Sequence, residues 1–299
     1  MVPPRPGPKP TEDFCPVKLF SGPPLSQFAA PATPGRADIR LVPIARLAAG
    51  GRWRVEAMRS YSEPLLLWFT RGQGRITVGG VTRGYGAHNA IFIPAGVMHG
   101  FEIGHQVHGT ALFFGRESEL DLPRSPQHLR VRDAIPQGEL SSILDAVQRE
   151  MDSTRPGHER AARHHLGLVG VWLERQMAEA AADPAAAAAP RPDAARRLAT
   201  RYAALLERKY RSGPTVAELA AELGVTATHL TRVCNRTCGR TAHALLADRK
   251  MHEARRLLAE TRLPVRDVAA NLGFASPAYF TRAFQGSTGK TPSEFRRQG

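Results

Sequence analysis

The sequence predicts a multidomain α+β protein with a β-rich first half and an all-α second half. Two observations carry this prediction. Short apolar or alternating segments separated by glycines fill residues 39–114, and residues 219–296 contain one pattern twice. Many short strands at even spacing indicate a sandwich or barrel, whereas a repeat of this length is typical of duplicated supersecondary units.

The chain begins with a proline-rich segment, residues 1–36, that lacks hydrophobic periodicity. Such a composition cannot bury enough apolar surface to order itself, so we expect a disordered leader there. No apolar run approaches the roughly 18 residues needed to span a bilayer. We therefore expect a soluble intracellular protein that does not bind membranes.

A β domain is expected over residues 37–120. Leu65 to Phe69 is an apolar run, while Arg52 to Ala57 and Arg75 to Val78 alternate apolar and polar side chains with the period of a strand. Paired glycines mark the turns between these segments. They are Gly72 with Gly74 and Gly79 with Gly80.

Residues 121–182 are expected to be a helical dimerisation or linker region. One helix covers residues 139–151, and a longer one follows Pro156 and Gly157. The longer helix carries an apolar stripe at helical spacing. Its members are Ala162, Leu166, Val169, Leu173 and Met177. The stripe either packs on its own β domain or forms a dimer seam, since a narrow stripe of two positions per heptad suits a coiled coil. Residues 183–192, alanines between prolines, predict a flexible linker.

Residues 193–299 hold the repeat. Leu219 to Gly224 is echoed by Val268 to Gly273, and Leu230 to Cys234 is echoed by Phe280 to Phe284. Each copy reads as a short helix, a glycine turn and a second helix with an outward arginine, which is a helix-turn-helix. Thr226 and Ser276 stand where a hydroxyl would cap the second helix.

The outward side chains of the two second helices form the expected DNA-reading surface. They are Thr226, Ala227, Thr228, Thr231, Arg232 and Asn235 in the first copy, and Ser276, Ala278, Tyr279, Thr281 and Arg282 in the second. Arginine can hold guanine through two hydrogen bonds, threonine can contact the thymine methyl group, and either can instead hold phosphate. A helix over residues 242–258 would fix the distance between the copies near one turn of DNA, about 34 Å.

The charge of the chain favours the same partner. The net charge is +14, and residues 191–299 hold 20 Lys and Arg against 9 Asp and Glu, while residues 1–190 hold 21 against 18. Most of the positive excess therefore lies on the repeat half, where a phosphate backbone would require it.

Cysteines are too few for a disulfide framework, because the chain has only three. Cys234 and Cys238 lie four residues apart, on one face of a helix. Because Cys234 aligns with Phe284 of the second copy, we expect it to be a core residue; a thiol switch or a metal pair with Cys238 is the alternative.

The repeat half resembles the DNA-binding domain of the AraC/XylS transcription regulators. The residues that carry this resemblance include Leu230-Thr231-Arg232, Arg249, Leu257-Leu258, Gly273-Phe274, Tyr279 to Phe284, Gly289, Thr291-Pro292-Ser293 and Phe295-Arg296. Cys234 departs from it, because the family has an aromatic residue there. The resemblance implies a seven-helix domain, binding to double-stranded promoter DNA and activation of transcription through RNA polymerase.

The segment from Ile93 to His99 resembles the second cupin motif, so a cupin-like β-barrel is expected for the first half. The first cupin motif supplies His-x-His and a glutamate as metal ligands, and residues 59–63 contain no histidine. Three or four ligands are needed for zinc or iron, so we expect no metal, no cofactor and no catalytic residue. The candidate effector contacts, each of which is alternatively plain core, are Trp53, Tyr61, Trp68, Phe92 and His99.

The sequence thus predicts a homodimeric, sequence-specific transcription regulator of the cytoplasm and nucleoid. We expect an activator controlled by an unidentified small-molecule effector in the cupin-like domain. Two alternatives stay open at this point: a metal-dependent cupin enzyme fused to a DNA-binding module, and a DNA-binding protein that responds to no ligand.

Overall fold

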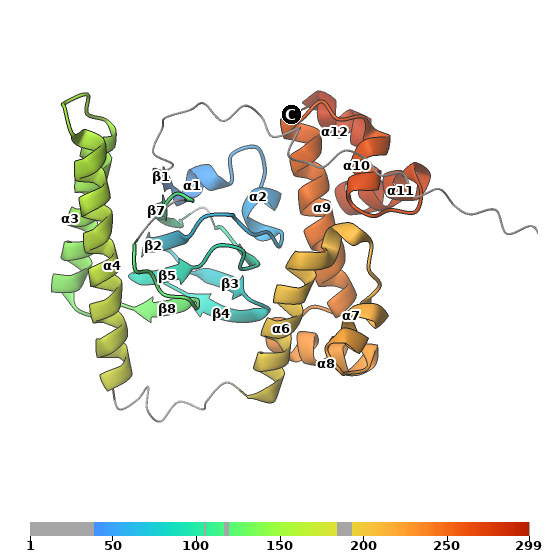
Figure 1. The fold of residues 1–299 in the computed structure, drawn as a ribbon, viewed down its shortest axis with the longest axis horizontal. Coiled ribbons are helices and arrows are strands. Elements are labelled where there is room, and N and C mark those ends of the chain that lie inside the picture. The colour runs from blue at the N-terminus through green and yellow to red at the C-terminus, as the bar shows by residue number, and fades with distance from the viewer. Residues whose placement is uncertain (1–38, 105, 117–119, 184–192, 299) are drawn as a thin grey trace, which may run out of the picture. The chain divides into compact units, whose positions relative to one another are not determined.

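The computed structural model describes residues 39–104, 106–116, 120–183 and 193–298 (Figure 1). The expected leader, residues 1–36, and the expected linker from residue 184 onward lie outside these ranges. Residues 39–183 hold two sheets and a pair of long helices, and are called the sheet domain below. Residues 193–298 are helical and are called the helical domain. The predicted α+β class, with strands first and helices second, is confirmed.

The strands of the sheet domain form antiparallel ladders. They are β1 (Arg40–Pro43), β2 (Leu65–Arg71), β3 (Gly74–Val78), β4 (Val81–Tyr85), β5 (Asn89–Ile93), β6 (His99–Phe101), β7 (His108–Phe113) and β8 (Gln127–Arg130). One sheet has the order β1-β7-β2-β5-β8 and the other the order β4-β3-β6. Among the described strands no ladder joins the two sheets, so the expected barrel is open.

The apolar run in β2 is explained by burial on both faces. Side chains alternate between the faces of a strand. Leu66 and Trp68 belong to the cluster that packs against the long helices, whereas Leu65, Leu67 and Phe69 belong to the cluster between the sheets. A strand covered on both sides has no polar face, which is why the sequence shows a continuous run rather than alternation.

Two elements differ from the sequence prediction. Residues 53–56 form a helical turn, α2 (Trp53–Glu56), rather than a strand, with Val55 N–H donating to Arg52 O at 3.0 Å. The Arg52–Glu56 pair at 2.7 Å is an (i, i+4) contact that a helix allows and a strand does not. The sheet domain also extends past the expected boundary at residue 120, because β8 pairs with β5.

Three further helices complete the sheet domain: α1 (Ile44–Leu47), α3 (Ala134–Met151) and α4 (His158–Ala182). The predicted stripe of α4 packs within the domain, since Ala162, Leu166, Val169 and Leu173 share a buried cluster with the outer face of the larger sheet. Trp172 locks α4 to α3 by donating its indole N–H to Pro136 O at 3.0 Å.

The helical domain contains seven α-helices within residues 193–298, as the resemblance implied. They are α6 (Ala194–Lys209), α7 (Val216–Glu222), α8 (Ala227–Cys238), α9 (Ala242–Glu260), α10 (Val265–Asn271), α11 (Pro277–Thr288) and α12 (Pro292–Gln298), with a 3₁₀ turn, η2 (Tyr210–Ser212), after α6. The predicted pairs α7–α8 and α10–α11 flank α9 in the chain (Figure 1).

The turn glycines and caps are those that the repeat indicated. Gly224 and Gly273 have φ values of 74° and 65°, a region that side-chain-bearing residues rarely adopt. The Thr226 hydroxyl accepts from His229 N–H at 3.2 Å, and the Ser276 hydroxyl accepts from Tyr279 N–H at 3.2 Å. The second helix of each copy is called a reading helix below. The two reading helices therefore begin at equivalent residues, α8 after Thr226 and α11 after Ser276.

Candidate nucleic-acid interface

The first reading helix, α8, divides cleanly into a buried and an exposed face. Leu230, Val233 and Cys234 are buried in the helical-domain core. Of the predicted reading residues, Thr226, Thr228, Arg232 and Asn235 are exposed, while Ala227 and Thr231 are half-buried. Four of the six predicted side chains in this copy are thus exposed.

The second reading helix, α11, shows the same division. Phe280 and Phe284 are buried. Ala278, Tyr279 and Arg282 are exposed, and Ser276 and Thr281 are half-buried. The equivalent arginines Arg232 and Arg282 are both exposed, and neither forms a salt bridge with a described residue.

Two exposed positions were missed by sequence reasoning. His229 is exposed one turn after the α8 cap, at the position equivalent to Tyr279, and Gln285 is exposed on α11 at the position equivalent to Asn235. Both could have been predicted from the 50-residue offset of the repeat, because His229 aligns with Tyr279 and Gln285 aligns with Asn235. Amide side chains such as Asn235 and Gln285 suit adenine, which offers a matching donor and acceptor.

Cys234 is fully buried, as expected of a core residue. Burial raises the pKa of its thiol to about 12, which keeps it in the thiol form. The Cys238 thiol donates to the backbone carbonyl of Cys234 at 3.2 Å and not to the Cys234 thiol. A protonated, buried thiol is a poor nucleophile and a poor metal ligand.

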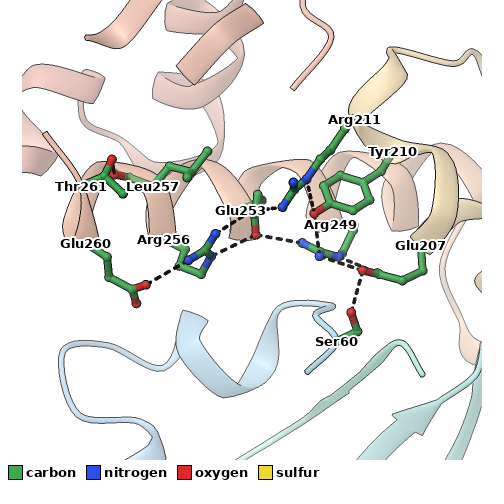
Figure 2. Close-up of polar contacts among 10 residues, drawn as sticks. All are labelled: Ser60, Glu207, Tyr210, Arg211, Arg249, Glu253, Arg256, Leu257, Glu260 and Thr261. Atoms are coloured by element: carbon green, nitrogen blue, oxygen red, sulfur yellow. Dashed lines mark hydrogen bonds and ion pairs between the residues drawn. The ribbon is translucent and has the colours of Figure 1, made fainter. Parts of the chain in front are cut away.

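The helix between the reading units, α9, is anchored by a buried ionic network (Figure 2). Arg249 donates to both carboxylate oxygens of Glu207 on α6, at 2.7 and 2.9 Å, and to the Tyr210 hydroxyl at 2.9 Å. Glu253 accepts from Arg256 at 2.8 Å and from Arg211 at 2.7 Å. A two-pronged arginine–carboxylate pair fixes orientation as well as distance, so α9 is held in one position against α6.

The charge state of the network follows from these contacts. Burial by itself would raise the pKa of Glu253, but the neighbouring cations Arg256, Arg249 and Arg211 outweigh burial and lower that pKa to about 2. Glu253 is therefore an anion at any physiological pH. Its charge offsets the arginines that surround it.

The sheet domain contacts α6 and α9 through the segment 53–60. Met58 N–H donates to the Asp248 carboxylate at 2.7 Å. Figure 2 shows the second contact, in which the Ser60 hydroxyl donates to Glu207 at 2.6 Å. The Trp53 ring lies edge-on to His252 at 5.6 Å. The ionic network is thus joined to the sheet domain through the Ser60–Glu207 contact.

The five predicted effector contacts do not gather in one pocket. Tyr61 and His99 lie together, with ring centroids 5.3 Å apart, and Trp53 lies at the contact with α9. Trp68 and Phe92 face the other side of the larger sheet, in the cluster with α3 and α4. A separate pocket of about 170 Å³ lies at the rim of the sheets, and its polar lining is Arg83, Gln127, His128 and Thr200.

Two further properties concern metals and membranes. In the described ranges, no group of three or more His, Cys, Asp and Glu side chains is arranged to hold a metal ion. None of the helices described has the length and apolar character needed to cross a bilayer.

Comparisons with known proteins give a match to one domain family and matches to curated regulators. A helix-turn-helix domain family matches residues 219–298. The arabinose operon regulatory protein of Salmonella typhimurium is 32% identical over 81 residues, 27% of this chain and 29% of that protein. The ornithine utilization regulator of Pseudomonas aeruginosa is 32% identical over 142 residues, 44% and 41% of the two chains.

One solved structure is similar to part of this chain. The C-terminal domain of AraT, a response regulator from Geobacillus stearothermophilus, is 27% identical and covers 37% of this chain and 89% of that one, with a TM-score of 0.33. This chain spans less than half the length of the two curated relatives, both of which are named as regulators. Over residues 219–298, the chain carries a helix-turn-helix DNA-binding domain of the AraC/XylS family of transcription regulators.

Proposed function

We propose that this protein is a sequence-specific transcription regulator that binds double-stranded promoter DNA with α8 and α11 in successive major-groove segments. The observation that carries the proposal is the duplicated exposed arginine, Arg232 and Arg282, on two equally capped helices. At 1.5 Å per residue, α9 is about 28 Å long, close to the 34 Å of one DNA turn. Genome-wide mapping of bound sites, followed by binding to mapped and scrambled sequences, tests it.

We further propose that the protein activates transcription through RNA polymerase under control of a small molecule bound by the sheet domain. The contact between the sheet domain and α9 supports it, because a ligand that shifts residues 53–60 would also shift the helix between the reading units. Transcription from a mapped promoter, with purified polymerase, should rise when this protein is added. Repression there would contradict the activator role. We also propose that the protein acts in the cytoplasm, where it associates with the nucleoid.

A homodimer is proposed through the outward face of α4. The buried stripe is unavailable, but a second stripe, His164, Leu168, Val171 and Arg175, has heptad spacing. Leu168 and Val171 are 50% and 41% exposed, and Ile135 of the adjoining α3 is 77% exposed. Exposed large apolar side chains grouped in this way are typical of protein interfaces.

Charging the α4 stripe should separate the dimer. Leu168→Glu with Val171→Glu places four carboxylates at a two-fold seam, and we expect sedimentation velocity to show monomers. Gln106→Glu, at an exposed loop position before β7, is the matched control and should stay dimeric. A wild-type protein that sediments as a monomer at every concentration would remove the dimer from the account.

The two competing functions predict different measurements. A metal-dependent cupin enzyme should carry stoichiometric metal, which elemental analysis of the purified protein detects. A DNA-binding protein without sequence preference should bind mapped and scrambled promoters equally.

A further inference from the structure

Arg59 and His99 form a buried pair of side chains where the sheet domain meets α9. Arg59 N–H donates to His99 O at 2.9 Å, and His99 N–H donates to Arg59 O at 2.7 Å, as an isolated antiparallel bridge. Directly opposed residues of such a bridge project their side chains from the same face. Both residues are only 1% exposed, so the guanidinium and the imidazole share one enclosed place.

The Arg59 guanidinium has an unused donor and no counter-charge. Its Nε donates to the Tyr61 hydroxyl at 3.0 Å, and its Nη1 donates to Val55 O at 2.6 Å. Its Nη2 is buried without an acceptor, and no described carboxylate forms an ion pair with it. Since a buried cation is costly unless an anion or further acceptors compensate it, the residue is suited to an anionic partner.

The neighbouring imidazole has an unused acceptor. His99 Nδ1 lies 2.9 Å from Val97 O, and a carbonyl only accepts, so Nδ1 carries the hydrogen. Burial, with Arg59 next to it, lowers the pKa of His99 to about 3, so the ring is neutral and Nε2 has a free lone pair. That nitrogen is also buried without a partner.

A third unused nitrogen comes from the helical domain. His252 of α9 is 8% exposed, and its Nδ1 is buried without a partner. The segment that carries Arg59 packs against this part of α9, since the Trp53 ring lies 5.6 Å from the His252 ring and Met58 N–H donates to the Asp248 carboxylate at 2.7 Å. Burial, and next to it the charge of Arg59, lower the pKa of His252 to about 2, so its ring is neutral. The cluster formed by Arg59, His99 and His252 therefore includes groups from both sides of the junction.

We propose that the cluster of Arg59, His99 and His252 binds a small hydroxycarboxylate, with the carboxylate on Arg59 and the hydroxyl donating to His99 Nε2. A carboxylate supplies the missing charge and accepts from Nη2, while a hydroxyl supplies the donor that Nε2 lacks. The assignment of this ligand as the effector rests on the proposed function, whereas its binding to the cluster does not. A bound ligand would connect β6 to α9, the helix that sets the spacing of the reading units.

Three probes that share one carbon skeleton test this site in the full-length protein. They are 2-hydroxypropanoate, propanoate without the hydroxyl, and propane-1,2-diol without the carboxylate. Calorimetric titration should rank their affinities in that order, with no binding of the diol. At ten times its Kd, 2-hydroxypropanoate should raise the midpoint of thermal unfolding by about 3 °C.

Variants assign the binding to this cluster. Arg59→Met keeps the side-chain length and removes the charge, and it should abolish binding of both acids. Arg83→Gln, in the separate pocket at the rim of the sheets, is the matched control and should bind normally. His99→Phe should make 2-hydroxypropanoate and propanoate bind equally, an outcome that a merely structural role would not produce. The midpoint without ligand shows whether each variant folds.

Three outcomes would overturn the proposal: no binding of either acid to the wild type, binding retained in Arg59→Met, or binding lost in Arg83→Gln instead. The calorimetric cell contains no DNA. A failure to bind promoters would therefore contradict the proposed function but not this ligand site. A failure to bind the two acids would contradict this ligand site but not the proposed function.

Discussion

Replacing Arg232 or Arg282 with alanine should weaken binding to the cognate promoter by about 5- to 150-fold, the equivalent of about 1–3 kcal/mol for a lost bidentate contact to a base. Both side chains are exposed and neither is in a salt bridge with a described residue, so their removal should leave the free energy of unfolding unchanged. Fluorescence anisotropy with labelled mapped and scrambled DNA measures the change.

The salt dependence of binding separates the two kinds of contact. An arginine that reads a base should lose specificity when removed, whereas one that holds phosphate should weaken all sequences alike and reduce the salt slope by about one. Arg201→Ala, on α6 and outside both reading helices, removes the same charge and should have little effect. Wild-type affinity in both Arg232→Ala and Arg282→Ala would refute the assignment of the reading surface.

Glu253→Gln should lower the free energy of unfolding by about 3 kcal/mol. The carboxylate of Glu253 is buried among Arg211, Arg249 and Arg256, and removing one partner of a buried ionic group leaves uncompensated charge. Glu260→Gln on the same helix is the matched control. Its carboxylate is half exposed, so the loss there should stay below about 1 kcal/mol. Urea unfolding monitored by circular dichroism gives both values.

The same residue predicts a pH dependence. The pKa of Glu253 is lowered from its ordinary 4.5 to about 2, so the folded state favours the charged form. Its contribution to stability is therefore complete above pH 4.5 and is lost as the pH falls toward 2. The difference in stability between wild type and Glu253→Gln should shrink over that range. A constant difference would show that the loss in the variant has a cause other than charge.

Local features of this fold were predictable from the sequence because local chemistry determines them. Gly224 and Gly273 lie at turns with positive φ, and the Thr226 and Ser276 hydroxyls cap the helices that follow, as the repeat indicated. A glycine turn and a capping hydroxyl act within a few residues of the chain. Sequence spacing alone therefore locates both reading helices.

Contacts between distant segments were not predictable in the same way. Residues 53–56 alternate like a strand but form a helical turn, because Trp53 packs against His252 of α9, about two hundred residues later in the chain. Arg59 carries no motif, and its burial opposite His99 depends on a bridge between a loop and β6. The network of Glu207, Arg249 and Glu253 joins α6 to α9 in the same non-local manner.

The central claim is that α8 and α11 read one face of the same promoter. Hydroxyl-radical footprinting on a mapped promoter tests it most directly, with wild type, Arg232→Ala and Arg282→Ala compared at matched occupancy. The account predicts two protected segments about one helical turn apart, with each variant losing protection in a different one. A single protected segment, or identical footprints in both variants, would contradict it.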